Sequence, residues 1–434
     1  MTNASSTNQL DISRSRFSLK VPLHVLAAGY AIGASYTVSL VGEIYVSELL
    51  ALAVLPFIRP HKIIKSSWML RKVLFGYCII LTGLVISDYY NSSEINNYLR
   101  GSANIIFAGV NLIFLFIIII NAPNTIITWL VTTVLVKFML GEHSLENYTY
   151  LIPENDFKSK IVPYLEPSVI LLGCLLAIKS RRLPGPLFCV SGAVMVIMGA
   201  RSSGAVLLIS GLALIMSGRK TLSKRKILVS GVLLGVLGVC AYLYYVDLVL
   251  SGNIASGVSH SVNQIRRMEN PYNPIELLML GRSQTFVALE AISERPVFGF
   301  GSWAPDIGGK YARLVAEMQN SERRLPVYYT PWIPSHSVLF TAWLWAGLLG
   351  LCGMLVVVSA VLRAILDNIR NNHYLSPAFY AFSIGFFWHL LFSPFGHVRT
   401  SFPITIAVVG VFAMGRVGLP RIRSRRLPSS RAAR

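Results

Sequence analysis

Charged residues are scarce in this chain. Of its 434 residues, 13% are charged and 54% are hydrophobic, and the mean hydropathy is +0.59. Soluble domains usually hold about a quarter charged residues, so this shortage excludes a soluble globular enzyme. The excess of apolar residues also excludes an intrinsically disordered chain.

Cysteine is rare as well, and its placement excludes two kinds of site. The five cysteines all lie within apolar runs, where cysteine behaves as a small apolar residue. No two of them form a C-x-x-C pair. We therefore expect neither disulfide bonds nor a thiolate metal site. The cysteines are Cys78, Cys174, Cys189, Cys240 and Cys352.

Several nucleotide-binding and catalytic motifs are also missing. The sequence has no G-x-x-x-x-G-K-[ST] loop, so we do not expect it to use ATP directly. It has no H-E-x-x-H motif and no D-x-D pair, so we expect no tightly bound divalent metal and no other cofactor. The G-x-S-x-G motif of serine hydrolases is absent too.

What the sequence has in abundance is long apolar segments. A membrane-spanning helix needs about 20 predominantly apolar residues. Twelve runs approach that length, although 44–58 and 204–217 are short. They predict an all-α integral membrane protein with about 12 transmembrane helices. The runs cover residues 21–42, 44–58, 73–90, 102–120, 124–140, 161–178, 186–200, 204–217, 227–246, 336–358, 378–395 and 400–415.

The basic residues gather in alternate connections between these runs. If the N-terminus is cytoplasmic, the cytoplasmic pieces hold 25 of the 39 lysines and arginines but only two of the 19 acidic residues. This bias follows the positive-inside rule, so we expect both termini in the cytoplasm. The cytoplasmic pieces are residues 1–20, 59–72, 121–123, 179–185, 218–226, 359–377 and 416–434.

The net charge of +20 therefore indicates membrane topology rather than a soluble partner. We interpret the basic segments 218–226 and 416–434 as topology determinants beside anionic lipid. The alternative is a docking site for nucleic acid or protein. We accordingly expect membrane lipids as neighbours and no nucleic acid as a partner.

One connection is much longer than the others. Residues 247–335 form an outward segment of 89 residues with equal numbers of basic and acidic residues. A structureless loop of that length is unusual, so we expect it to be partly helical. The chain then divides into a transmembrane bundle of about nine helices (1–246), a large outward loop (247–335), and C-terminal transmembrane helices with a basic tail (336–434).

The clearest pattern in the loop is GRSQTFVALEAISERPVFGFG, which begins at residue 281. Phe286, Leu289 and Ile292 recur at spacing three, which predicts a short amphipathic helix. Arg282 lies near its N-terminus, where a guanidinium can grip a phosphate with two parallel hydrogen bonds. The alternatives are a salt bridge to Glu276 and a snorkelling surface arginine.

Two further candidates lie at the ends of apolar runs. Arg201 stands at the outer end of a run beside a tight turn, and charges at that depth are functional hypotheses. Its alternative is a turn cap or a lipid-headgroup contact. His336 opens the tenth run, where a neutral imidazole can accept a proton from a hydroxyl and later release it. Its alternative is a structural histidine bonded to a loop carbonyl.

Other charged residues lie in or beside the runs. HLLFSPFGHVRTSFP places Arg399 near the last outward turn, together with two histidines. Arg399 could serve a phosphate as a third cation, or it could contact lipid headgroups. Glu48, Lys137 and Glu166 lie within apolar runs, where we expect them to pair in helix packing, with a substrate role as the alternative.

These candidates form an outward set of arginines with one histidine above a membrane bundle. Without a metal, such a set suits a lipid-linked anionic substrate. The simplest is a pyrophosphate, whose leaving-group charge the arginines can stabilise.

Three segments also resemble a known family. GRSQTFVALEAISERPVFGFGS is similar to the G-R-x-x-x-(W/F)-x-x-A-x-x-x-I-x-x-x-P-x-x-G-x-G signature of the O-antigen ligase and Wzy-type polymerase superfamily. PSHSVLFTAWLWAGLLG resembles its A-H-(N/S)-x-x-L-x-x-x-x-x-x-G-x-x-G motif, and RSSGA resembles its S-R-[SG]-[AG] element. The resemblance covers about residues 200–355. Ala200 stands where the element has serine, ligases often have His-Asn where this chain has His336–Ser337, and the stretch 302–335 matches no part of the pattern.

The resemblance implies a GT-C-like glycosyltransferase of the bacterial inner membrane, which takes glycans from undecaprenyl pyrophosphate at the periplasmic face. It implies that Arg201 and Arg282 contact the pyrophosphate and that His336 assists the acceptor hydroxyl or the leaving group. We therefore predict His336 and Arg282 as catalytic, and Arg201, Arg282 and Arg399 as pyrophosphate-binding, although Arg399 matches no family motif.

The expected activity is metal-independent polymerisation of lipid-linked repeat units in exopolysaccharide synthesis, of the succinoglycan-polymerase type. One alternative is an O-antigen ligase, which transfers the glycan to lipid A–core. Another is a transporter without chemistry, which would tolerate loss of His336 but need intramembrane charges such as Lys137. The expected partners are the lipid-linked donor, a glycan or lipid-linked acceptor, a chain-length regulator and export proteins.

Overall fold

The structure is a computed structural model of the chain. It describes residues 23–39, 42–58, 60–140, 157–217, 239–240, 242–252, 262, 265–266, 268–318, 331–369 and 373–415. Most of the ninth apolar run, 227–246, lies outside the described residues. The same is true of the basic segments 218–226 and 416–434, to which the sequence assigns a cytoplasmic side.

The described part of the chain is predominantly α-helical. Its apolar helices coincide with the apolar runs of the sequence, and four of them (α4, α5, α7 and α15) are long and apolar enough to cross a membrane. The fold is therefore all-α with transmembrane character, whereas the number of twelve spans stays a prediction. The apolar helices are α1 (Leu23–Gly33), α2 (Val46–Val54), α4 (Trp68–Tyr90), α5 (Ile95–Asn121), α6 (Thr125–Leu140), α7 (Val162–Lys179), α8 (Pro184–Ile197), α9 (Arg201–Ser217), α15 (Val338–Asn368), α16 (Ser376–Phe392) and α17 (His397–Ala413).

Shorter elements connect these helices. A two-stranded antiparallel hairpin, β1 (Thr37–Ser39) and β2 (Glu43–Tyr45), joins α1 to α2. The described part of the large loop includes the helices α12 (Pro274–Gly281), α13 (Ser283–Glu294) and α14 (Lys310–Met318). The remaining short elements are η1 (Leu55–Phe57), α3 (Pro60–Ser66), η4 (Phe157–Ile161) and η6 (Ile307–Gly309).

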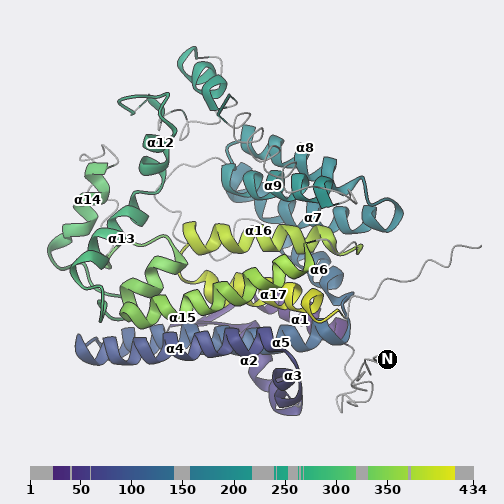
Figure 1. Ribbon diagram of the computed structural model, residues 1–434, viewed down its shortest axis with the longest axis horizontal. Helices are drawn as coiled ribbons and strands as arrows, with labels where there is room; N and C mark the ends of the chain where they lie inside the picture. The colour runs from purple at the N-terminus through teal and green to yellow at the C-terminus, as the bar shows by residue number, and fades with distance from the viewer. Residues whose placement is uncertain are drawn as a thin grey trace, which may run out of the picture.

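The long helices pack closely through small residues. In Figure 1, α4, α15, α16 and α17 run side by side along the length of the molecule. A Cβ on Gly76 of α4 would lie 2.7 Å from the backbone oxygen of Gly353 of α15, and a Cβ on Gly192 of α8 would lie 2.7 Å from that of Gly204 of α9. Side chains of this size let helix backbones approach within a membrane, where van der Waals packing drives helix association.

Large apolar side chains remain exposed on the helices. Phe75 of α4, Phe138 of α6 and Val190 of α8 are each more than 60% exposed. Soluble monomers rarely expose extended apolar surface. These flanks therefore fit a lipid environment.

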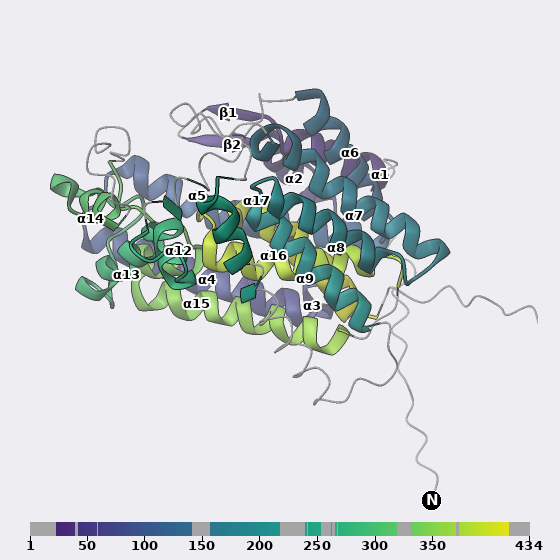
Figure 2. The same ribbon diagram turned by 90° about the horizontal axis from the view of Figure 1, so that it is seen from above.

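The helix ends that the charge pattern predicts to face outward meet at one end of the bundle. Figure 1 and Figure 2 show α13 and α14 together at that end. The Asn91 side chain after α4 donates to the backbone oxygen of Gly299 (3.2 Å), and Ser337 before α15 donates to that of Leu390 in α16 (2.9 Å). We call this the outer end of the bundle; the side of the membrane that it faces stays a prediction.

Candidate functional site at the outer end of the bundle

Arg282 occupies the N-cap position of α13, and the helix begins at the next residue. A helix therefore forms where the spacing of apolar residues predicts one. Its buried side differs from the expected one, because Leu289 is 36% exposed. Instead, pairs of residues four positions apart form the buried side of the helix. The buried apolar residues of α13 are Val287, Ala288, Ala291 and Ile292.

The contacts of the Arg282 side chain are neutral among the described residues. Nη1 donates to the backbone oxygen of Phe392 (3.1 Å) and Nη2 to Oγ of Ser202 (3.3 Å). The guanidinium also lies over the rings of Trp388 and Phe392, at 5.5 and 5.2 Å from their centroids. Burial lowers the pKa of Arg282. A half-buried cation is therefore held by dipoles and ring faces rather than by a carboxylate.

Glu276, the salt-bridge partner considered from the sequence, binds elsewhere. Its carboxylate accepts hydrogen bonds from the backbone N–H groups of Glu269 (2.6 Å) and Asn270 (3.1 Å). This carboxylate fastens the turn that precedes α12. It is therefore not the partner of Arg282.

Arg201 is the first residue of α9, directly after the tight turn from α8. Its guanidinium lies 5.8 Å from the ring centroid of Tyr245. The next residue, Ser202, accepts the hydrogen bond from Arg282, so the two arginines meet at the same helix end. The positive pole of the α9 dipole adds to their charge. This arrangement favours an anionic ligand.

His336 lies in the connection before α15 and is surrounded by positive charge. Burial is the main cause that lowers its pKa from 6.5 to about 4, and the charges of Arg282, His397 and Lys158 lower it further. The imidazole is therefore neutral near pH 7 and can accept a proton. His336 thus lies near Arg282, and Ser202 links Arg282 to the start of α9, where Arg201 lies. We call Arg201, Arg282 and His336 the cationic cluster.

The residues around His336 hold it in place. Ser337 caps α15 by accepting a hydrogen bond from the backbone N–H of Phe340 (3.3 Å), and its hydroxyl donates to α16 as described above. On the other side, the hydroxyls of Ser335 and Thr341 are 2.7 Å apart. Fixed neighbours of this kind suit a group that must meet a substrate hydroxyl in one orientation.

Two further histidines adjoin the cluster. The rings of His389 and His397 are stacked, with centroids 4.2 Å apart. Nδ1 of His389 lies 2.9 Å from Oγ of Ser393, and Nδ1 of His397 lies 2.8 Å from Oγ of Ser401. The sequence places both histidines near the last outward turn but assigns them no role.

Arg399 is held in a different way from Arg282. Its Nε and Nη2 bind the two carboxylate oxygens of Glu48, a residue with no exposed surface. Nη2 also donates to the backbone oxygen of Glu43 (2.7 Å). Glu48 therefore pairs within the bundle, as its position in an apolar run indicates. Arg399 therefore already has a carboxylate partner, and its binding of pyrophosphate stays a prediction.

Helix α15 is broken at a point where glycines from two of the sequence motifs meet, which gives a reason for glycine at these positions. Gly347 has φ 61° and ψ −153°, so the helix is interrupted there. Residues 297–301 pack into the break and satisfy the freed backbone groups. A Cβ on Gly347 would lie only 2.0 Å from the backbone oxygen of Val297. The hydrogen bonds join Phe300 N to Leu344 O (2.8 Å), Gly301 N to Trp345 O (3.1 Å) and Leu348 N to Val297 O (2.9 Å).

Carboxylates anchor the loop beyond this point. Asp88 of α4 accepts hydrogen bonds from the backbone N–H (2.6 Å) and hydroxyl (2.8 Å) of Ser302. Asp306 accepts from the backbone N–H groups of Tyr311 (3.2 Å) and Ala312 (2.8 Å) at the start of α14. Asp88 therefore holds the loop against the bundle, and Asp306 fixes the start of α14 within the loop.

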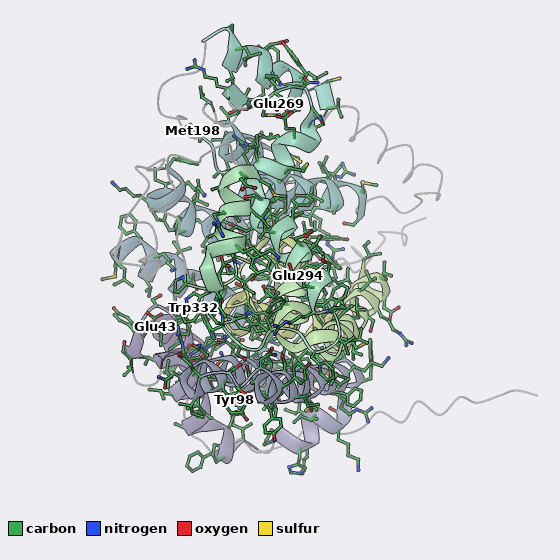
Figure 3. All side chains as sticks on the ribbon, turned by 90° about the vertical axis from the view of Figure 1, so that its left-hand side faces the viewer. Glu43, Tyr98, Met198, Glu269, Glu294 and Trp332 are labelled. Carbon is green, nitrogen blue, oxygen red and sulfur yellow. The ribbon has the colours of Figure 1, made fainter. Side chains whose placement is uncertain are left out.

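Arg399 also lines a cavity of about 880 Å³ at the outer end. Arg100 and Glu43 belong to its lining, as do three tryptophans from the loop and α15. Glu43 and Trp332, both labelled in Figure 3, lie on the face of the molecule that this view presents. Neither Arg282 nor His336 lines this cavity, which adjoins the cationic cluster without containing it.

Sequence reasoning missed several of these residues. Lys158 and Arg100 lie in stretches predicted to face outward, but no motif separates them from other basic residues. Ser202 falls in the RSSGA element, and only its hydrogen bond to Arg282 reveals its part in the site. The described residues contain no group of three or more His, Cys, Asp or Glu side chains placed to hold a metal ion.

The residues brought together here come from α9, the α13 cap, the connection before α15 and the facing ends of α16 and α17. Compared with known proteins, the chain matches no protein-family model and no curated protein.

Proposed function

We propose that this protein is a glycosyltransferase of the bacterial inner membrane that polymerises undecaprenyl-pyrophosphate-linked repeat units during exopolysaccharide synthesis. In this proposal both termini are cytoplasmic and the outer end of the bundle faces the periplasm. One observation carries it: the half-buried Arg282 has only neutral partners among the described residues and lies beside Arg201 and His336.

The charge of the cluster supports a pyrophosphate ligand. A buried cation without a carboxylate is unfavourable unless an anion binds it. Arg282 and Arg201 approach the same helix end, so two guanidinium groups can share the oxygens of one pyrophosphate. In the transition state these donors stabilise the charge that develops on the leaving group.

His336 supplies the proton-handling group. The hydroxyl oxygen of the acceptor sugar forms a bond to the anomeric carbon of the donor glycan, while the bond from that carbon to the pyrophosphate oxygen breaks. The neutral imidazole of His336 accepts the hydroxyl proton. The lipid pyrophosphate leaves with the bonding electron pair and stays beside the arginines.

Ser337 helps to distinguish polymerisation from ligation, the two reactions of the family that the chain resembles. Ligases often have asparagine at this position, whereas here Ser337 caps α15 and bonds to α16. This difference favours polymerisation over transfer to lipid A–core.

The test is reconstitution with natural substrate. Purified protein in phospholipid nanodiscs would receive lipid-linked intermediates extracted from a strain that lacks this gene. We expect a ladder of lipid-linked products at multiples of the repeat unit, together with free undecaprenyl pyrophosphate. Transfer only to added lipid A–core would identify a ligase and overturn the polymerase proposal. Unchanged intermediates alongside an active control transferase would overturn the transferase itself.

A further inference from the structure

The cavity at the outer end offers a second binding site beside the cationic cluster. It is bounded by β2, α5, α14, the start of α17 and the loop residues between α13 and α15. Its volume of about 880 Å³ lies within the range of roughly 300–1,000 Å³ found for small-molecule sites. Gln284, Ser335 and Gly396 line it, and each lies one or two residues from Arg282, His336 or His397. The cavity therefore runs up to the cluster.

One wall of the cavity is aromatic. The rings of Trp303 and Trp332 meet edge to face with centroids 5.9 Å apart, and Trp345 lies 5.4 Å from Trp303. The guanidinium of Arg100 lies 4.2 Å from the Trp303 ring centroid. Trp303 has φ 52°, a left-handed conformation that bulky residues rarely adopt. Its position is thus imposed by the surrounding fold.

The rest of the lining is polar. Glu43, Arg100, Asn104 and Gln284 contribute a carboxylate, a guanidinium and two amides. Ser102, another lining residue, is 8% exposed, and its hydroxyl has no hydrogen-bond partner among the described residues. A hydrocarbon chain in this cavity would leave the charged and amide groups of the lining unsatisfied. A ligand rich in hydroxyl groups would pair with them.

We propose that this cavity binds the sugar rings at the non-reducing end of the acceptor glycan. This inference rests on the proposed function and extends it to the acceptor. A sugar ring has an apolar C–H face that packs on an indole ring and a rim of hydroxyls that bind amides and charged groups. The tryptophan wall and the polar lining offer both. A sugar at the cavity end near Ser335 places its hydroxyl beside His336.

The charges of the two sites differ in a way that fits two ligands. The cluster sets two arginines beside a neutral His336, whereas the cavity combines Glu43 with Arg100, and its Arg399 is paired with Glu48. A mixed lining suits neutral, polyhydroxylated groups. The cluster then binds the donor pyrophosphate, and the cavity binds the acceptor sugar.

Calorimetric titration of the full-length protein in nanodiscs separates the two sites. One probe is inorganic pyrophosphate; the other is the oligosaccharide released by mild acid from the lipid-linked intermediates. We expect Trp332→Ala to weaken oligosaccharide binding at least tenfold and to leave pyrophosphate binding unchanged. Arg282→Ala should do the reverse. Trp68→Ala, at the opposite end of the bundle, is the matched control and should alter neither.

The outcomes distinguish the inference from the proposed function. Wild-type oligosaccharide affinity in both Trp332→Ala and Gln284→Ala would overturn the sugar site, as would absence of oligosaccharide binding to the wild type. Binding of lauric acid that Trp332→Ala abolishes, without oligosaccharide binding, would make it a lipid cavity and also overturn the inference. By contrast, pyrophosphate binding that Arg282→Ala does not alter would remove the proposed function and leave the sugar site standing.

A second variant covers the case of misfolding. If Trp332→Ala loses both ligands, Trp332→Phe keeps an aromatic face of smaller area at the same place. We expect it to bind pyrophosphate normally and the oligosaccharide with reduced affinity. Normal affinity for both probes in Trp332→Phe and in Gln284→Ala would count against the sugar site.

Discussion

Arg282 and Arg399 lie at the same end of the bundle but in opposite electrostatic surroundings. Arg399 binds both oxygens of the fully buried Glu48. Arg282 meets a carbonyl, a hydroxyl and two ring faces. The first charge is neutralised within the protein, and the second meets only neutral groups among the described residues. Two arginines with similar positions at helix ends thus serve stability in one case and, as we propose, binding in the other.

The largest effect should come from His336, which adjoins Arg282. General acid–base assistance contributes about 10²- to 10⁴-fold, so His336→Ala should reduce glycan transfer by that factor. The side chain precedes α15 rather than packing within it, so the variant should insert and fold normally. Polymer formed per amount of membrane protein is the measurement. Wild-type transfer by His336→Ala would return this residue to a structural role.

Removing the carboxylate partner of Arg399 should lower the stability of the protein rather than its transfer activity. Glu48→Ala leaves the Arg399 guanidinium without its carboxylate, which typically destabilises a protein by about 3–5 kcal/mol. Thermal unfolding in detergent would measure the loss, with the exposed Glu290→Ala as control. The double variant Glu48→Ala, Arg399→Ala should lose less than the two single losses together. Additive losses would show that the two side chains are not coupled.

Arg282→Lys sharpens the comparison further. Lysine keeps the charge but loses the planar fork that binds two oxygens at once. We expect transfer to fall at least about tenfold, or 1.4 kcal/mol in the activation barrier, with no change in unfolding temperature. Arg399→Lys should show the opposite pattern: transfer should be unchanged and the unfolding temperature should fall. Full activity of Arg282→Lys would argue that its fork contacts no pyrophosphate.

A pH profile tests whether Arg282 acts on His336 through its charge. Because the pKa of His336 is lowered to about 4, the acid limb of kcat/KM should lie near pH 4 rather than near 6.5. Arg282→Gln removes one of the charges that lower this pKa, so the limb of its residual activity should move to higher pH. The lowered pKa also makes the stability of the folded protein depend on pH. In the unfolded chain His336 binds its proton near pH 6.5, so its contribution to the free energy of unfolding is complete above pH 6.5 and is lost as the pH falls towards 4.

The smallest expected effect is that of a chelator. If Arg201 and Arg282 stabilise the leaving group, transfer by the purified protein should be unchanged in EDTA. The same assay with and without added Mg²⁺ or Mn²⁺ measures this. Activity that disappears in EDTA and returns with a divalent ion would assign the charge stabilisation to a metal instead.

The local features of the site could be predicted from the sequence. The spacing of apolar residues indicates α13, and Arg282 lies at its start because the pattern begins there. The turn between two apolar runs places Arg201 at the first position of α9. Such features depend on neighbours within one or two helical turns, which the sequence displays directly.

Features that join distant segments could not be predicted in this way. Glu48 and Arg399 are 351 positions apart, and neither helix pattern reveals that the two side chains face each other. The run WLWAGLLG reads as continuous apolar helix, yet α15 breaks at Gly347 because residues 297–301 supply the missing hydrogen bonds. The cavity likewise takes its lining from several separate elements, so no single motif announces it.

The break in α15 also sets an order for biosynthesis. Residues 297–301 leave the ribosome before the backbone groups of 344–348 that pair with them. Until the tenth apolar run has emerged, the backbone N–H groups of Phe300 and Gly301 lack their final acceptors, and unpaired backbone groups do not settle into a buried position. Residues 297–301 therefore reach their final position only after the first part of α15 has been made. A nascent chain that stops before residue 344 would carry both arginines of the cationic cluster and still lack the acceptors that fix residues 297–301.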